Sequence, residues 1–159
     1  MVQDEVEVPG WGRLPPCSFG SSPEVEERLA ALVIAGRKRA TVWDGREENP
    51  TEPGKRWAVM ARGRAVAVME TVAVGRRRFH EIDDDFAALE GEGDGSLAFW
   101  RMAHEDYFRQ SGAFDPEMWL WWEEFRLVAV IDEALAARAP EHVAAEEAEA
   151  RAALAARGP

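Results

Sequence analysis

A lysine and a threonine lie three residues apart where a predicted helix ends and a predicted strand begins. The helix should close at Gly36, so that Lys38 and Thr41 point from the following turn into one pocket. A partly desolvated lysine can lose its proton and act as a base, and Thr41 would then be a nucleophile. In the structural alternative, which the spacing alone favours, Lys38 neutralises the helix C-terminal dipole and Thr41 opens the strand.

Carboxylates alternate with glycines in a second cluster, which is the predicted turn containing Glu90, Glu92 and Asp94. Because neighbouring carboxylates resist joint ionisation, one of them is expected to have a raised pKa suited to general acid or base chemistry. The alternative is that all three are exposed carboxylates at a helix end. In that case Asp94 and Ser96 would favour the N-terminus of the next helix.

A third group of side chains, Trp100, Arg101 and His104, follows within one turn or so of that next helix. Arg101 could bind a carboxylate or a phosphate, and Trp100 could stack on a nucleobase. Since a tryptophan on an apolar helix face more often belongs to the core, core packing is the alternative role of Trp100.

Several common site types are excluded. There is no phosphate-binding loop, dinucleotide glycine fingerprint, His-Glu-x-x-His or Gly-x-Ser-x-Gly motif. The single cysteine, Cys17, rules out an internal disulfide and a cysteine-based zinc site, and we interpret it as a buried or idle thiol. The three histidines are far apart in sequence. We therefore predict no metal and no cofactor.

Charge is distributed unevenly along the chain. A net charge of −11 argues against general affinity for nucleic acid. Between Arg37 and Arg78, however, there are eleven basic and five acidic residues. This middle segment forms either a basic patch or a set of arginines scattered over solvated strands and turns.

The elements that would position these residues follow from caps and periodicity. Ser22 and Pro23 begin a helix that ends at Gly36. We further expect a short strand at 41–43, a hairpin of strands 57–61 and 64–74, a short helix at 83–89, a helix from Ser96 to about Gln110, and one or two strands at 119–131. The mixture predicts an α+β domain.

Both ends of the chain differ from this middle. Residues 1–18 read as an extended arm, 19–131 as one domain, and 132–159 as an Ala- and Glu-rich helical extension that Pro140 splits in two. The extension could pack on the domain, mediate self-association or fray. No apolar stretch reaches membrane-spanning length, and the N-terminus is acidic, so we expect no membrane association and a cytoplasmic location.

The order of these motifs resembles the ASCH domain proteins of bacteria. The matching segments are Phe19-Gly20-x-Ser22-Pro23, Ala35-Gly36-x-Lys38-x-Ala40-Thr41, Glu70-Thr71, Glu90-Gly91-Glu92-Gly93-Asp94-x-Ser96-Leu97-Ala98-x-Trp100-Arg101-x-x-His104, and Glu124-Phe125-x-Leu127-Val128. The resemblance implies a PUA-like α+β fold: a small β-barrel with flanking helices and a cleft proposed to hold RNA or a nucleoside.

The resemblance also implies site residues. Some family members are acetylcytidine amidohydrolases and some are reported as ribonucleases; in the amidohydrolases a lysine and a threonine act with a glutamate. The matching positions here are Lys38 and Thr41, with Glu90 or Glu92 as the glutamate. Those enzymes have an arginine two residues after the threonine, where this chain has Trp43. The implied ligand-binding residues are Trp43, Asp94, Ser96, Trp100, Arg101 and His104.

Three functions remain open at this stage. The first is a recognition module for RNA or a modified nucleoside, in which Lys38 and Arg101 meet phosphate or base edges and Trp43 or Trp100 stacks. The second is a metal-independent amidohydrolase or ribonuclease with Lys38 as base and Thr41 as nucleophile. The third is a protein-interaction or self-association module that uses the acidic helical tail.

Overall fold

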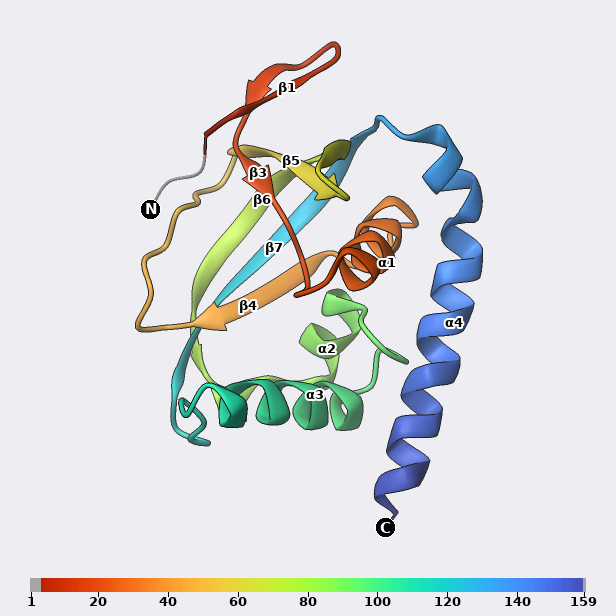
Figure 1. Cartoon of the computed structure of the whole chain (residues 1–159). Helices are drawn as coiled ribbons and strands as arrows, with labels where there is room; N and C mark the ends of the chain where they lie inside the picture. The colour runs from red at the N-terminus through yellow and green to blue at the C-terminus, as the bar shows by residue number, and fades with distance from the viewer. Residues whose placement is uncertain (1–3, 159) are drawn as a thin grey trace.

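The structure is a computed structural model that describes residues 4–158. Its centre is a five-stranded sheet in the order β3-β5-β6-β7-β4 (Figure 1). The strands are β3 (Pro16–Cys17), β4 (Ala40–Asp44), β5 (Arg56–Ala61), β6 (Arg64–Arg78) and β7 (Trp119–Val130). β3 pairs with β5 in parallel, and the other pairs are antiparallel. Because β3 and β4 are the two edges of this sheet, the expected closed barrel is not confirmed.

The predicted hairpin joins β5 to β6 through Arg62 and Gly63. Both residues have positive φ angles, 50° and 80°, which suits a tight two-residue turn between twisted strands. β6 continues four residues beyond the predicted end of its run and pairs along its length with β7, with a register shift between Thr71 and Ala73. β7 is one strand, not two.

The two predicted N-caps, Ser22 and Ser96, are confirmed. Helix α1 (Pro23–Ile34) begins after Ser22, whose side chain accepts from the Val25 N–H. Asp83 caps α2 (Asp84–Glu90) and Ser96 caps α3 (Leu97–Gln110) in the same way. Gly91, in the left-handed conformation, ends α2, and Ser96 fixes where α3 begins, so these two residues bound the turn that carries Glu92. A short 3₁₀ helix, η1 (Phe79–Glu81), precedes α2.

A close backbone contact places that turn against the turn before β4. Gly91 has a φ angle of 68°, and a Cβ atom at this position would lie 2.1 Å from the carbonyl oxygen of Arg37. Only glycine fits such an approach in the left-handed region. The end of α2 is therefore locked onto the Arg37–Lys38 backbone.

Three apolar clusters hold the layers together. The first packs α1 and the C-terminal helix α4 (Glu133–Arg157) on one face of the sheet around Leu32 and Phe125. The second packs α2 and α3 against β4 and β7 around Phe86, Trp100 and Leu120. The third lies under the N-terminal hairpin. The sheet is thus covered on parts of both faces.

The N-terminal arm is more regular than expected. It contains the antiparallel hairpin of β1 (Val6–Val8) and β2 (Gly12–Leu14). Val8 is fully buried and packs in the third cluster, with Trp11 partly buried beside it. The arm is therefore attached to the body of the protein by apolar contacts.

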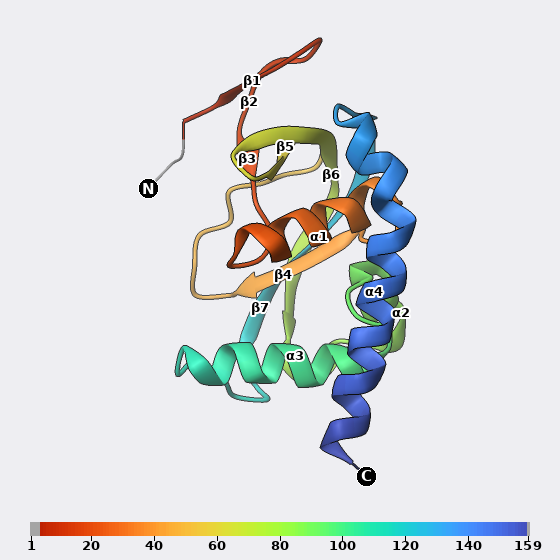
Figure 2. The same cartoon turned by 45° about the vertical axis from the view of Figure 1, so that its right-hand side comes forward.

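The C-terminal extension is a single helix, α4 (Glu133–Arg157). The expectation of two pieces was wrong, because the helix runs on through Pro140. A proline removes one backbone hydrogen bond, but Leu135 and Ala139 are buried against the domain and the alanine-rich sequence favours helix. α4 lies along α1 and continues past α2 and α3 (Figures 1 and 2). No helix within residues 4–158 combines the length and apolar character needed to span a membrane.

Candidate functional site

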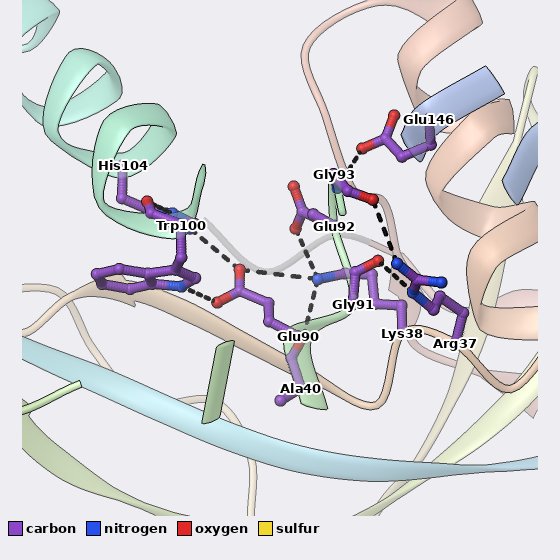
Figure 3. A network of polar contacts seen from close by, with 10 residues as sticks. All are labelled: Arg37, Lys38, Ala40, Glu90, Gly91, Glu92, Gly93, Trp100, His104 and Glu146. Carbon is purple, nitrogen blue, oxygen red and sulfur yellow. Dashed lines mark hydrogen bonds and ion pairs between the residues drawn. The ribbon is translucent and has the colours of Figure 1, made fainter. Parts of the chain in front are cut away.

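A buried lysine forms the centre of the candidate site (Figure 3). Lys38 is 1% exposed. Its Nζ donates to the Ala40 carbonyl and to Glu92 Oε2, both at 2.8 Å, and lies 3.8 Å from Glu90 Oε1. The last residue of α2 and the turn after it therefore place two carboxylates at one ammonium group.

Glu90 is bound from its other side by α3. Trp100 Nε1 donates to Glu90 Oε2 at 2.5 Å, and His104 Nε2 lies 3.0 Å from Glu90 Oε1. His104 Nδ1 lies 2.8 Å from the Trp100 carbonyl oxygen, which can only accept. Both ring nitrogens of His104 therefore face acceptors when Glu90 is ionised, and this geometry is satisfied by the protonated imidazolium.

The charges in this cluster shift the pKa of Glu90 and His104. Burial alone would raise the pKa of Glu90, but the charges of His104 and Lys38 and the hydrogen bonds from His104 and Trp100 outweigh it and lower this pKa to about 2. Burial alone would lower the pKa of His104, but the Glu90 carboxylate outweighs it and raises this pKa. Glu90 and His104 thus form a charged pair that holds the end of α2 on α3.

Lys38 and Glu92 differ in how firmly they hold their charge. Burial would lower the pKa of Lys38, but the carboxylates of Glu92 and Glu90 raise it overall. This direction is opposite to the one that a neutral lysine base requires. Burial and the nearby Glu90 carboxylate raise the pKa of Glu92, although Lys38 opposes them. Glu92 is also 27% exposed, whereas Lys38 and Glu90 are buried, so Glu92 is the more accessible carboxyl of this cluster.

A second polar network, which sequence reasoning missed, lies across the sheet from Thr41. The Thr41 position on β4 pairs with Glu123 on β7. Glu123 is 5% exposed and accepts a 2.6 Å hydrogen bond from Thr71 Oγ1, which lies 2.6 Å from Thr51 Oγ1. Burial raises the pKa of Glu123, and Thr71, Lys38 and Lys55 oppose that effect. The signal in the sequence was the pair Glu123-Glu124, which interrupts a largely apolar strand.

The comparisons with known proteins can now be added to this geometry. The family model for the ASCH domain matches residues 16–129. The chain belongs to the ASCH domain family. A crystal structure of an ASCH domain from Lactobacillus crispatus is similar, with 29% identity, a TM-score of 0.66, and coverage of 72% of this chain and 79% of that one. Protein EF3133 from Enterococcus faecalis is 27% identical, with a TM-score of 0.64 and coverage of 74% and 82%. No curated protein matches the chain.

Helix α4 lies outside the matched ASCH region and binds the turn that carries Glu92. Arg37 donates to the carbonyls of Gly91 at 3.2 Å and Gly93 at 3.4 Å, and to Glu147 at 2.5 Å. Glu146 accepts a 2.8 Å hydrogen bond from the Gly93 N–H. Of the roles predicted for the C-terminal extension, packing on the domain is the one that the structure bears out.

Aromatic and cationic side chains continue the sheet face on which Thr41 and Glu123 lie. Trp43 pairs with Trp121 and stacks on it at 6.3 Å between ring centroids. The Arg76 guanidinium lies 5.1 Å from the ring centroid of Trp119 and 5.3 Å from that of Trp121. Arg78 lies 4.4 Å from the Trp119 ring centroid. We call Trp43, Trp119, Trp121, Arg76 and Arg78 the Trp/Arg strip.

Other predicted ligand-binding residues have structural roles. Trp100 is 3% exposed, and its ring packs on His104 and Phe79, so it is not free to stack on a base. Asp94 accepts from the Ser96 N–H, and Ser96 caps α3. These contacts support the structural alternatives for Trp100, Asp94 and Ser96. Arg101 is exposed on α3 and is not part of the Lys38 cluster.

Among residues 4–158 there is no group of three or more His, Cys, Asp or Glu side chains that could hold a metal ion. Cys17, which was predicted to be buried or idle, has its pKa raised to about 12, because of burial first and then the charge of Glu123.

Two hollows, of about 560 and 230 Å³, lie away from the Lys38 cluster. The larger is lined by Gly20, Ser21, Ser22, Pro23, Glu26, Arg62 and Gly63. The smaller is lined by Arg77, Asp83, Asp85, Phe86, Leu89, Trp122 and Glu124.

Proposed function

We propose that this ASCH domain binds a ligand that carries a nucleobase, either a nucleoside or a nucleotide of single-stranded RNA, beside Lys38, Thr41 and Glu92. The observation that carries the proposal is the continuity of one sheet face. Thr41 and Trp43 alternate along β4, opposite Glu123 and Trp121 of β7, so their side chains project from the same face. Along this face the Thr41 hydroxyl and the Glu123 carboxyl are thus followed by the rings of Trp43 and Trp121.

The Lys38 ammonium does not serve as the phosphate contact in this proposal. Its two hydrogen bonds and its close approach to Glu90 use its donors within the protein. Lys38 instead fixes the position of Glu92, whose carboxyl is partly exposed. A carboxyl group in that position can accept hydrogen bonds from the N–H groups of a base, and when protonated it can donate one.

The Trp/Arg strip favours RNA over a free nucleoside as the ligand. Indole rings and guanidinium planes are the groups on which unpaired bases stack, and guanidinium groups also bind phosphates. The five positions of the strip carry two cations and no carboxylate, although Glu117 lies 3.9 Å from Arg78. A single strand could thus place one base beside Glu92 and the next ones on the strip.

The experiment that tests the proposal is a titration of the purified protein with cytidine, acetylcytidine and a short single-stranded RNA, followed by calorimetry. Binding of the RNA, weakened by rising salt, supports the extended site. Binding of nucleosides alone restricts the ligand to the region of Glu92 and Thr41. Absence of binding to all three probes contradicts the proposal.

Hydrolysis of an acylated nucleoside or of RNA is the second candidate function. The observation in its favour is the 2.8 Å hydrogen bond from Lys38 to Glu92, a partly exposed carboxyl. Lys38 lies just before β4, the strand that carries Thr41. Because the pKa of Lys38 is raised, Lys38 stays positively charged and does not act as a base. The pKa of Glu92 is also raised, so Glu92 would be the general acid or base in this mechanism. Chromatographic analysis of acetylcytidine and RNA after incubation tests this function. Full turnover by Thr41→Val excludes Thr41 as the nucleophile.

A further inference from the structure

Glu123 is a buried carboxyl for which the proposed function has no role. It lies in the middle of β7 and is 5% exposed, yet within residues 4–158 no Lys, Arg or His forms an ion pair with it. Burying a carboxylate without a cation is costly unless hydrogen bonds compensate. The groups that form hydrogen bonds with Glu123 therefore indicate whether its carboxyl is protonated or ionised.

The hydrogen bonds to Glu123 belong to a chain of hydroxyl groups. Trp57 Nε1 lies 3.1 Å from Thr51 Oγ1, and an indole N–H can only donate. Thr51 is thus free to donate its own proton to Thr71 Oγ1 at 2.6 Å, and Thr71 donates to Glu123 Oε2 at 2.6 Å. In this arrangement Oε2 accepts. When Glu123 is protonated, the proton resides on the other oxygen, Oε1.

Oε1 is the oxygen that remains available. Among the described residues no protein group donates to it, whereas every fully buried side-chain polar atom there has a partner. Oε1 must consequently reach accessible surface. Glu123 lies directly across from Thr41 on the same sheet face, so this oxygen belongs to the space beside the proposed ligand site.

Two lysines act on this carboxyl in addition to the Thr71 hydrogen bond. Lys38, before β4, and Lys55, before β5, both favour the ionised form, while the Cys17 thiol of β3 is neutral. Burial favours the protonated form more strongly, so the pKa of Glu123 is raised overall. The protonated and ionised forms therefore exchange at a higher pH than for an exposed glutamate.

We propose that Glu123 is a further ligand-binding residue, which presents a proton on Oε1 to a nitrogen acceptor of the bound base. The inference rests on the proposed function for the identity of the ligand. A hydroxyl donor at this place pairs with the unprotonated ring nitrogen N3 of a cytosine. It opposes the N3–H donor of a uracil. Glu123 is thus assigned a role in discriminating cytosine-type from uracil-type bases.

The test compares the affinities of cytidine and uridine, and of short single-stranded oligocytidylate and oligouridylate, from about pH 5 to about pH 8. In the wild type the preference for cytosine should be about tenfold at low pH, the value of one hydrogen bond, and should fall as pH rises. Glu123→Gln carries a permanent N–H₂ donor in place of the titrating group. Its preference should not change with pH.

Glu124→Gln is the matched control, because its side chain projects from the opposite face of β7. It should keep the pH-dependent preference of the wild type. Binding without a cytosine preference, or an unchanged pH dependence in Glu123→Gln, overturns the role of Glu123 while leaving the proposed function intact. Absence of binding to every probe by the wild type overturns both.

An infrared titration of the free protein tests the proton itself. The carboxylic acid C=O band lost in Glu123→Gln should persist in the wild type above the pH at which exposed glutamates ionise. Thr51→Val should shift that band, because Thr71 then loses its upstream donor. A Glu123 that is ionised over the whole range contradicts the inference.

Discussion

The carboxylate of Glu146, in helix α4, accepts a 2.8 Å hydrogen bond from the backbone N–H of Gly93. Gly93 lies next to Glu92, and Arg37 ties the same turn to Glu147. A helix outside the matched ASCH region thus positions the carboxyl that the proposed function uses. The C-terminal extension is a structural part of the site in this chain.

Removing that contact should affect binding more than folding. In Glu146→Ala the Gly93 N–H loses its acceptor, and we expect ligand affinity to fall about tenfold. The free energy of unfolding should fall by only about 1 kcal/mol, since α4 is also anchored by apolar packing. Glu149→Ala is the control, because that side chain is 69% exposed and, among residues 4–158, its carboxylate pairs with Arg28 alone. Equal losses of affinity in both variants would contradict a specific role for Glu146.

Replacing Lys38 should be among the most destabilising single substitutions in the chain. Lys38→Met leaves Glu90 and Glu92 without the cation between them, and removing one partner of a buried ion pair costs about 3–5 kcal/mol. Urea denaturation would measure the loss. The control is Lys55→Met, whose ammonium binds the Pro50 carbonyl at the surface. A change below about 1 kcal/mol for Lys38→Met would show that the cluster does not depend on its charge.

The stability of the protein should depend on the ionisation of Glu90. Its pKa is about 2 in the folded protein against 4.5 for an ordinary glutamate. Because the folded value is the lower one, this contribution is present above about pH 4.5 and is lost as pH falls toward about 2, with a size on the order of 3 kcal/mol. The difference in unfolding free energy between wild type and Glu90→Gln should therefore shrink over this range. A constant difference would contradict the assigned charge state.

The Trp/Arg strip makes a separate prediction about RNA. Arg76→Ala and Arg78→Ala should each weaken binding of single-stranded RNA and reduce the slope of log affinity against log salt by about 1. Arg77→Ala provides the control, because Arg77 projects from the other face, over Trp122. If Arg77→Ala weakens binding as much as the others, the RNA does not follow the strip.

Much of the fold could be predicted from the sequence because local signals determine it. Ser22, Asp83 and Ser96 cap their helices as their residue types predict, and Arg62-Gly63 makes the hairpin turn. The continuity of α4 through Pro140 could not be predicted in this way. It depends on the burial of Leu135 and Ala139 against α1, which is a tertiary effect.

The contacts of the candidate site could be predicted only where the family resemblance links motifs that are far apart in sequence. The meeting of Lys38 with Glu90 and Glu92 followed from two motifs and the family resemblance. The burial of Trp100 against Glu90 and His104 could not be read from spacing, because the same helix face could equally have lined a cleft. Glu123 was missed because its partners, Thr71 and Thr51, reach it only through sheet register and a loop.

The most direct test of the central claim is calorimetric titration of the wild type and Glu92→Gln with a short single-stranded RNA and with cytidine. In Glu92→Gln the amide oxygen can still accept from Lys38, and Glu90 remains as the counter-charge, so the fold should stay intact while the titrating carboxyl is removed. We predict binding by the wild type and at least tenfold weaker binding by Glu92→Gln. Equal affinities of the two proteins, or no binding by either, would contradict a nucleobase site at Lys38 and Glu92.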